Sequence, residues 1–135
     1  MDISTAKANY PGAETFKFGD SEALSESLLS LVKSGKKTAT CGALSEYGEG
    51  GDVMSEVGRI DIALNWDGTP AVALRMLSVV VTKFCDVDES FALAEGEDDD
   101  LEGWRRGHQG YFERNGGFDP EMSLVCERFE VVEMF

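Results

Sequence analysis

The sequence predicts an α+β fold, a small and mainly antiparallel β-barrel with flanking helices. Two segments with strand-like spacing are joined by a strong hairpin signal, a third strand-like segment ends the chain, and segments with helical spacing precede and separate them. Strands that pair in hairpins, with helices inserted between groups of strands, are typical of an α+β domain. A chain of 135 residues suits one domain, so we expect residues 1–135 to share a single core.

The N-terminal third contains one clear helix. Residues 1–15 show no period, and we expect a poorly patterned N-terminal extension there. Residues 19–35 (GDSEALSESLLSLVKSG) follow, with apolar residues at the spacing of an amphipathic helix. These apolar residues are Ala23, Leu24, Leu28, Leu31 and Val32. Asp20 or Ser21 can cap the start of this helix, and Gly35 suits the left-handed position after its end.

A hairpin occupies the middle of the chain. Residues 58–65 (GRIDIALN) alternate apolar and polar side chains, which indicates a strand with one buried side. Asp67 and Gly68 then give the strongest short-range signal for a hairpin turn, and residues 70–84 form the second, longer strand. The β-branched run at 79–81 in this strand predicts either burial on both faces or a bulge.

Two helices and a closing strand follow the hairpin. A short helix is expected at 89–94, then a very acidic loop at 95–102, and a longer helix over 101–117 (LEGWRRGHQGYFERNGG). The aromatic side of the longer helix carries Trp104, His108, Tyr111 and Phe112. Residues 122–135 alternate again and predict the closing strand. One side of that strand carries Val125, Glu127, Phe129 and Val131.

The charge of the chain argues against one class of function. A net charge of −14 repels polyanions at long range, so we expect no tight binding to duplex DNA. The acidic loop at 95–102 could instead meet a basic protein partner, although such runs are usually solvated surface. No apolar run is long enough to span a bilayer, and the N-terminus lacks a signal pattern. We therefore expect a cytoplasmic protein with no membrane partner.

Cysteine and histidine content limits the cofactors. The three cysteines, Cys41, Cys85 and Cys126, are far apart and form no CxxC pair, which indicates neither a thiolate zinc site nor a disulfide framework. His108 is the only histidine, which excludes a multi-histidine metal site within one chain. We expect no metal and no cofactor. Cys41 follows a lysine-rich turn and is expected to be a buried, small apolar side chain.

That turn, GKKTAT at residues 35–40, is the candidate catalytic motif. Lys37 and Thr40 lie three residues apart just after the first helix, so an amine and a hydroxyl can meet there if the chain turns. A threonine hydroxyl becomes a useful nucleophile when a base removes its proton. A lysine can be that base if its pKa falls from about 10.4 to about 7 or 8, which requires burial in a water-poor site. A nearby carboxylate would oppose this fall in pKa, but it could order the lysine or relay a proton.

Four segments resemble a known family. FGDSEALSESLLSLVKSGKKTAT, VGRIDIALNWDGTPAVAL, FALAEGEDDDLEGWRRGHQGYF and VCERFEVV cover most of residues 16–132 and are similar, in this order, to bacterial ASCH-domain proteins, a branch of the PUA-like superfamily. The resemblance implies a PUA-like β-barrel flanked by helices. It also implies a link to RNA, because ASCH domains resemble RNA-binding PUA domains and were proposed to bind RNA on that basis.

One bacterial branch of the family comprises small amidohydrolases that remove the acyl group from acetylated cytidine. Matched to that branch, the turn offers Thr40 as nucleophile and Lys37 as its base, and FALAEGE offers Glu95 as an orienting or relaying acid. The chain departs from the family after the lysine, where many ASCH domains carry an acidic residue and then an arginine and this chain has Thr40 and Gly42. It also has a helix at 101–117 that the branch members lack.

These observations support two classes of function. The first is an enzyme, a hydrolase that acts on the amide of an acylated cytidine in a barrel cleft that takes a nucleoside, a nucleotide or an RNA-derived group. The second is a non-catalytic RNA-binding module, with an RNA-cleaving ASCH protein as a further alternative. The expected ligand-binding residues are Lys36, Thr38, Arg75, His108 and Tyr111, whereas Trp104 and Phe112 are expected in the core.

Overall fold

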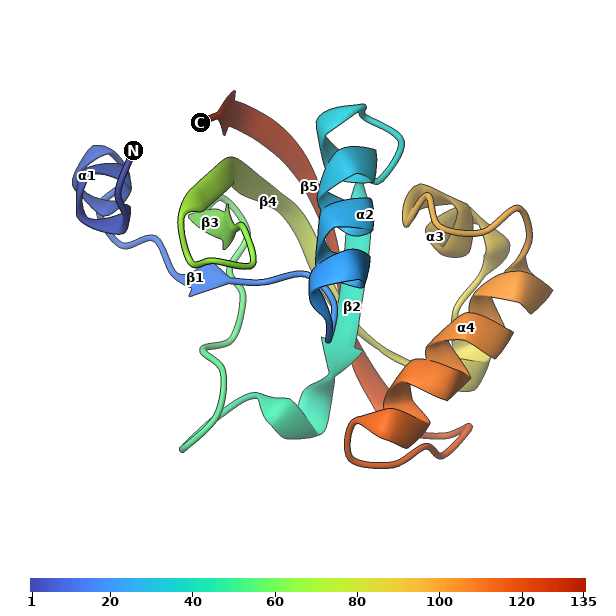
Figure 1. The fold of residues 1–135 in the computed structure, drawn as a ribbon. Helices are drawn as coiled ribbons and strands as arrows, with labels where there is room; N and C mark the ends of the chain where they lie inside the picture. Colours follow the sequence, from blue (N-terminus) through green and yellow to red (C-terminus); the bar gives the residue numbers. More distant parts are fainter.

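Two long strands organise the fold, which the computed structural model describes over all residues 1–135 (Figure 1). The sheet contains β1 (Thr15–Phe16), β2 (Ala39–Ala43), β3 (Ile60–Leu64), β4 (Pro70–Lys83) and β5 (Ser123–Met134). The helices are α1 (Ile3–Asn9), α2 (Glu22–Lys33), α3 (Glu89–Ala94) and α4 (Leu101–Arg114), with short 3₁₀ turns η1 (Leu44–Glu46) and η2 (Phe84–Asp86). None of the helices combines the length and the apolar character that a membrane span requires.

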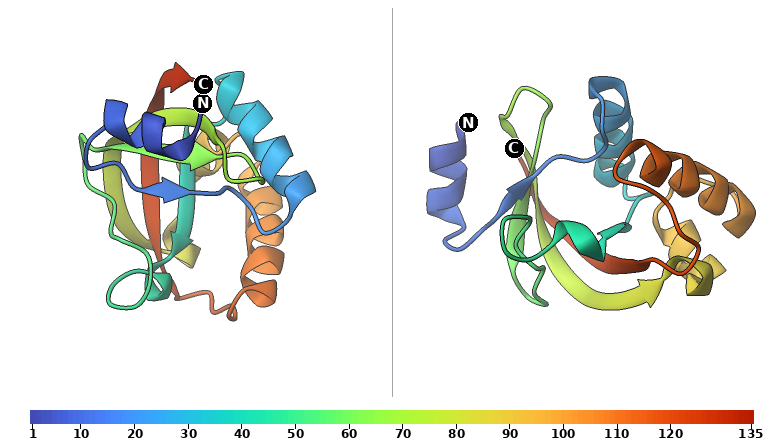
Figure 2. Two further views of the ribbon diagram at one scale, coloured as in Figure 1. Left: turned by 60° about the vertical axis from the view of Figure 1, so that its left-hand side comes forward. Right: turned by 90° about the horizontal axis from the view of Figure 1, so that it is seen from below.

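The five strands form one curved sheet in the order β1-β3-β4-β5-β2. All neighbours are antiparallel except β1 and β3, so the α+β, mainly antiparallel prediction is confirmed. The expected barrel is only loosely matched, because the sheet is not closed and leaves β1 and β2 as its two edges. Figure 2 shows how strongly β4 and β5 bend, so that the sheet wraps partly around the space in front of it.

The bend has a local cause in β4. The pairing of β4 with β5 shifts register between Ala73 and Leu74 and again between Met76 and Ser78, and such bulges bend a strand. The predicted bulge is therefore close to its expected place, just before the 79–81 run. The alternative of burial on both faces is wrong, since Val80 and Val81 are about half exposed.

Most elements lie where the sequence patterns predict them. Ser21 caps α2 by accepting a hydrogen bond from the backbone N–H of Leu24, and Gly35 follows the helix with a φ of +81°. The β3–β4 hairpin, α3, α4 and the closing strand β5 also match their predicted ranges. Within residues 1–15, where the sequence shows no period, α1 forms and buries Ala6 against Ile62 and Leu64 of β3. A seven-residue helix with a single buried alanine leaves no apolar period in the sequence.

Two further apolar clusters hold the helices on the sheet. Leu28, Leu29 and Val32 of α2 pack with Leu74 and Met76 of β4. The second cluster joins α3 and α4 to the sheet, and it includes Phe91, Trp104, Phe112, Leu124 and Cys126. Trp104 and Phe112 therefore lie in the core, as expected. The cavity described below lies between α2, which packs in the first cluster, and α4, which packs in the second.

Gly96 brings the end of α3 against the turn that follows α2. It has a φ of +74°, and a Cβ built on it would lie 2.5 Å from the carbonyl oxygen of Lys36 and 2.9 Å from the backbone nitrogen of Lys37. The backbone N–H of Thr38 donates to the carbonyl of Ala94 at 2.7 Å across the same contact. This close approach fixes where Lys37 and Glu95 meet.

Gly96→Ala should therefore destabilise the fold more than the same change at Gly35. Both glycines have positive φ, which costs an alanine about 1–2 kcal/mol, but nothing lies within 4 Å of a Cβ at Gly35. At Gly96 the backbone of 36–37 must also move, so we expect a total loss of about 3 kcal/mol or more. Urea denaturation of both variants measures the difference. Equal losses would mean that the α3 contact does not constrain the turn.

Candidate functional site

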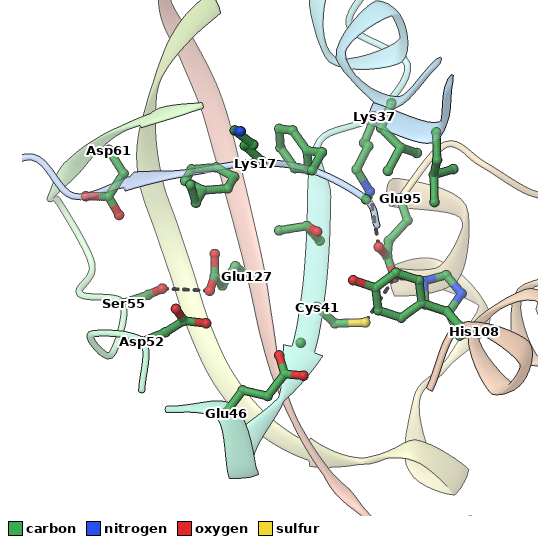
Figure 3. Close-up of a pocket in the computed structure, with 18 of the residues that line it drawn as sticks. Lys17, Lys37, Cys41, Glu46, Asp52, Ser55, Asp61, Glu95, His108 and Glu127 are labelled. Carbon is green, nitrogen blue, oxygen red and sulfur yellow. Dashed lines mark hydrogen bonds and ion pairs between the residues drawn. The ribbon is translucent and has the colours of Figure 1, made fainter. Parts of the chain in front are cut away.

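A cavity of about 640 Å³ lies between the two edge strands of the sheet and the helices α2 and α4 (Figure 3). Acidic side chains outnumber lysines and arginines in its lining. The acidic residues are Glu14, Glu46, Asp52, Asp61, Glu95, Glu97, Asp98 and Glu127, and the lysines and arginines are Lys17, Lys37, Arg59 and Arg114. A pocket of this size can hold a small organic ligand.

Lys37 reaches the cavity from the turn after α2. Its side chain is only 1% exposed, and its Nζ donates to Oε1 of Glu95 at 3.1 Å and to Oε2 of Glu97 at 2.9 Å. Burial by itself would lower the pKa of Lys37, but the charges of Glu95 and Glu97 outweigh burial and raise the pKa. Lys37 is therefore a buried ammonium. The condition that the sequence argument set for a lysine base, a pKa lowered to near neutrality, is not met.

Glu95 ends α3 and is the centre of a hydrogen-bond network. Its Oε1 faces Lys37, and its Oε2 accepts from the indole Nε1–H of Trp104 and lies 3.2 Å from Nε2 of His108. Burial would raise the pKa of Glu95, but the Lys37 ammonium, together with His108 and Trp104, lowers it well below its usual range. Glu95 is thus an ionised carboxylate whose oxygens are already hydrogen-bonded, which makes it a weak proton acceptor.

Both ring nitrogens of His108 lie beside hydrogen-bond acceptors. Its Nδ1 lies 2.9 Å from the carbonyl oxygen of Trp104 and its Nε2 faces Glu95, so the ring donates to both acceptors only when it is protonated. Burial would lower the pKa of His108, but the hydrogen bond and the charge of Glu95 raise it above the usual value. The ring also stacks on Trp104, with centroids 4.2 Å apart.

Cys41, Glu95 and His108 form the one cluster that resembles a metal site. Their potential ligand atoms all lie within 4.8 Å of one another. A metal needs a thiolate and an unprotonated imidazole nitrogen. Burial, followed by the charge of Glu95, raises the pKa of the Cys41 thiol well above its usual value, and the Cys41 thiol donates to Oε2 of Glu95 at 3.5 Å. In this structure the three residues form a hydrogen-bond network, in which Glu95 also accepts from Lys37 and Trp104.

Thr40 and Glu127 face the cavity side by side. They are register partners on β2 and β5, and both line the cavity. Glu127 is only 6% exposed, and its Oε1 accepts hydrogen bonds from Ser55 Oγ at 2.6 Å and Tyr47 Oη at 3.3 Å. Neither Thr40 Oγ1 nor Oε2 of Glu127 has a hydrogen-bond partner within the chain, and no hydrogen bond joins Thr40 to Lys37.

The structure brings together five of the eight residues that the sequence singled out. Lys37, Thr40, Glu95, His108 and Tyr111 all line the cavity. Lys36, Thr38 and Arg75 are exposed and do not line it. Thr38 donates to the carbonyl of Ala94, and Arg75 pairs with Glu130 on the sheet surface at 2.8 Å. From the acidic loop, Glu95 and Glu97 form ion pairs with Lys37.

Sequence reasoning did not assign a role to Glu127, Glu97, Tyr47 or Ser55. Glu127 had a visible signal, because it is a single acidic residue among the apolar residues of one side of the closing strand. Glu97 is one acidic residue in a run of acidic residues, and nothing in the sequence distinguishes it. Tyr47 packs on Gly42, where a Cβ would lie 3.4 Å from the tyrosine oxygen, and this contact cannot be read from the sequence.

The raised pKa of His108 makes a prediction about stability. A group whose pKa is higher in the folded state stabilises the fold fully below its unfolded-state pKa of about 6.5, and this contribution is lost as pH rises through the folded-state value. NMR of the single histidine should therefore give a pKa above 6.5 that falls in Glu95→Gln. Urea denaturation of wild type relative to His108→Gln should show the stabilisation shrinking as pH rises. A histidine that titrates at or below the free value would contradict the network.

Comparisons with known proteins place the chain in a family. A sequence model of the ASCH domain matches residues 14–133. An ASCH domain from Lactobacillus crispatus is 30% identical, with a TM-score of 0.82 over 95% of this chain and 84% of the other. A protein from Enterococcus faecalis is 35% identical, with a TM-score of 0.80 over 91% of this chain and 82% of the other. No match appears among the curated proteins. The family match spans most of the chain and agrees with the fold, so the chain belongs to the ASCH-domain family.

Proposed function

We propose that this ASCH domain binds a small, uncharged nucleoside-like ligand in its cavity and hydrolyses an amide on the base, as expected for an acylated cytidine. The observation that supports this most is the buried pair of Lys37 and Glu95, which opens onto the cavity that Thr40 also lines. Burying an ion pair costs desolvation free energy, and apolar residues of similar volume often stabilise a fold as well or better. Stability of the fold alone therefore does not explain a buried ion pair at this place. Buried titratable groups with shifted pKa values in a cleft are candidates for catalysis.

The charge of Lys37 changes the role that we assign to it. Thr40 is the nucleophile that attacks the carbonyl carbon of the amide. The Lys37 ammonium then stabilises the negative charge that develops on the carbonyl oxygen, because a cation in a water-poor site acts strongly on such charge. Glu95 holds the ammonium in place, and His108 and Trp104 hold Glu95. Lys37 is not the resting-state base.

The charges of the cavity favour a nucleoside over a phosphorylated ligand or an RNA strand. Arg59 pairs with Asp61 at 2.8 Å, and Arg114 pairs with Asp20 at 3.1 Å. Lys37 has two carboxylate partners. Lys17 is the one lysine or arginine of the lining without a carboxylate partner, and it donates to the carbonyl oxygen of Trp66. ASCH domains are associated with RNA binding, but a net charge of −14 and an acidic lining repel a polyanion.

Substitution of Thr40 and Lys37 tests the proposed reaction. With cytidine acetylated on its exocyclic amino group as substrate, Thr40→Ala and Lys37→Met should each lower kcat by about 10²-fold or more. Thr38→Ala and Lys36→Met are matched controls, since they change the same residue types in the same turn outside the cavity, and they should retain turnover. Release of cytidine is followed by chromatography, and circular dichroism confirms that each variant is folded.

Two outcomes would contradict this function. Full turnover in both Thr40→Ala and Lys37→Met would remove the proposed site. Binding of short RNA with an affinity that falls steeply as salt rises, without turnover of the acetylated nucleoside by wild type, would favour the RNA-binding alternative.

A further inference from the structure

The proposed reaction leaves Thr40 without a base. Lys37 is protonated in the resting structure and has no proton-accepting lone pair. Glu95 is ionised, but its two oxygens already face Lys37, Trp104 and His108. A threonine hydroxyl needs a neighbouring acceptor to become a nucleophile, and the catalytic hydrogen bond to that acceptor often shortens only when the substrate binds.

Glu127 is the carboxylate beside Thr40. Directly opposed residues of an antiparallel pair point to the same face, with Cβ atoms about 4.5–5.5 Å apart. Thr40 on β2 and Glu127 on β5 are such a pair. Figure 3 shows Glu127 and Glu95 on opposite sides of β2, and Thr40 comes from the strand between them.

One oxygen of Glu127 is fixed and the other is free. Ser55 and Tyr47 both donate to Oε1, which orients the carboxylate, whereas Oε2 has no partner in the chain and faces the cavity that it lines. Glu127 as a whole is only 6% exposed, and its Oε2 is the oxygen that stays accessible from the cavity, because the one buried side-chain atom without a partner is the hydroxyl oxygen of Ser25. The structure thus contains a buried, oriented acceptor next to the nucleophile.

We propose that Glu127 is the general base of the reaction and accepts the proton of Thr40 through Oε2. This inference rests on the amide hydrolysis proposed above and adds a catalytic residue to it. It separates two tasks, because Lys37 supplies positive charge on one side of Thr40 and Glu127 accepts the proton on the other.

The proton movements balance over the cycle. The Thr40 proton moves to Oε2 of Glu127 as the bond from Thr40 Oγ1 to the carbonyl carbon forms, and the carbonyl electron pair moves to its oxygen beside Lys37. The C–N bond then breaks, and the leaving nitrogen takes the proton from Glu127, which releases cytidine and leaves an acyl ester on Thr40. Glu127 next takes a proton from water as the hydroxide attacks the ester. The C–Oγ1 bond breaks, Thr40 recovers the proton, and the carboxylic acid product leaves.

The surroundings of Glu127 make it a stronger proton acceptor than an exposed glutamate. Burial raises its pKa above the usual value, although the hydrogen bonds from Ser55 and Tyr47 lower it in part. Asp61 also raises the pKa of Glu127, and Arg59 lowers it. Glu46 and Asp52, from η1 and the loop after it, line the same cavity and add negative charge. A raised pKa makes a carboxylate a stronger proton acceptor once it is ionised.

Glu127→Gln keeps the shape and an acceptor for Ser55 and Tyr47 but cannot take a proton. With acetylated cytidine as substrate, we expect kcat to fall about 10²–10⁴-fold with little change in KM. The wild-type rate should fall at low pH, as Glu127 becomes protonated, and this acid limb should be lost in the residual rate of Glu127→Gln. Glu127→Asp should restore part of kcat and the acid limb. Glu130→Gln is the matched control, because it removes an exposed charge from the same strand outside the cavity and should leave the rate unchanged.

The outcomes separate this inference from the proposed function. If Thr40→Ala is inactive while Glu127→Gln keeps its kcat and its acid limb, Glu127 is not the base and the proposed function stands. If Glu127→Gln raises KM alone, the carboxylate is a ligand contact and the inference is overturned. If wild type does not hydrolyse the nucleoside at all, the proposed function fails and this inference fails with it. If Glu127→Gln does not fold, the wild-type acid limb and the Glu127→Asp rescue decide the question, and the absence of both overturns it.

Discussion

The buried ion pair between Lys37 and Glu95 is the interaction on which the rest of the site depends. It joins the turn after α2 to the end of α3, two segments that are 58 residues apart along the chain. Removing either partner would leave an uncompensated charge in the interior, which costs more than the pair contributes. The close approach at Gly96 and the backbone hydrogen bond from the N–H of Thr38 to Ala94 hold the two backbones in register for this pair. His108 and Trp104 then fix the remaining oxygen of Glu95.

The open edge of the sheet explains why a cavity exists beside this pair. A closed barrel of five strands would fill its interior with side chains. Here β1 and β2 are separate edges, and the space between them is bordered by α2, α4 and the segment from Tyr47 to Arg59. The alternation of β2 places Thr40 toward the same face as Glu127, while Cys41 lies 3.5 Å from Glu95. One short strand thus separates the Lys37–Glu95 ion pair from the Glu127 carboxylate.

Much of this arrangement could be predicted from local patterns. The apolar spacing of α2, the Asp67-Gly68 turn and the aromatic side of α4 identified their elements, and the family resemblance identified Lys37, Thr40 and Glu95. The protonation state of Lys37 could not be predicted, because it depends on Glu97, which is one of many acidic residues in its loop. The register between β2 and β5 could not be predicted either, so nothing in the sequence indicated that Thr40 pairs with Glu127. The helix α1 was not predicted because Ala6 is its only buried residue.

The charge of Lys37 is the most direct test of this account. Nitrogen NMR of the Nζ of Lys37, identified by its loss in Lys37→Met, reports whether the group is an ammonium or an amine. The structure predicts an ammonium that persists from about pH 6 to about pH 10, because Glu95 and Glu97 raise the pKa above the reference value of about 10.4. A Lys37 that titrates near pH 7 or 8, at about the value of a lysine general base, would contradict the account and return the role of base to Lys37.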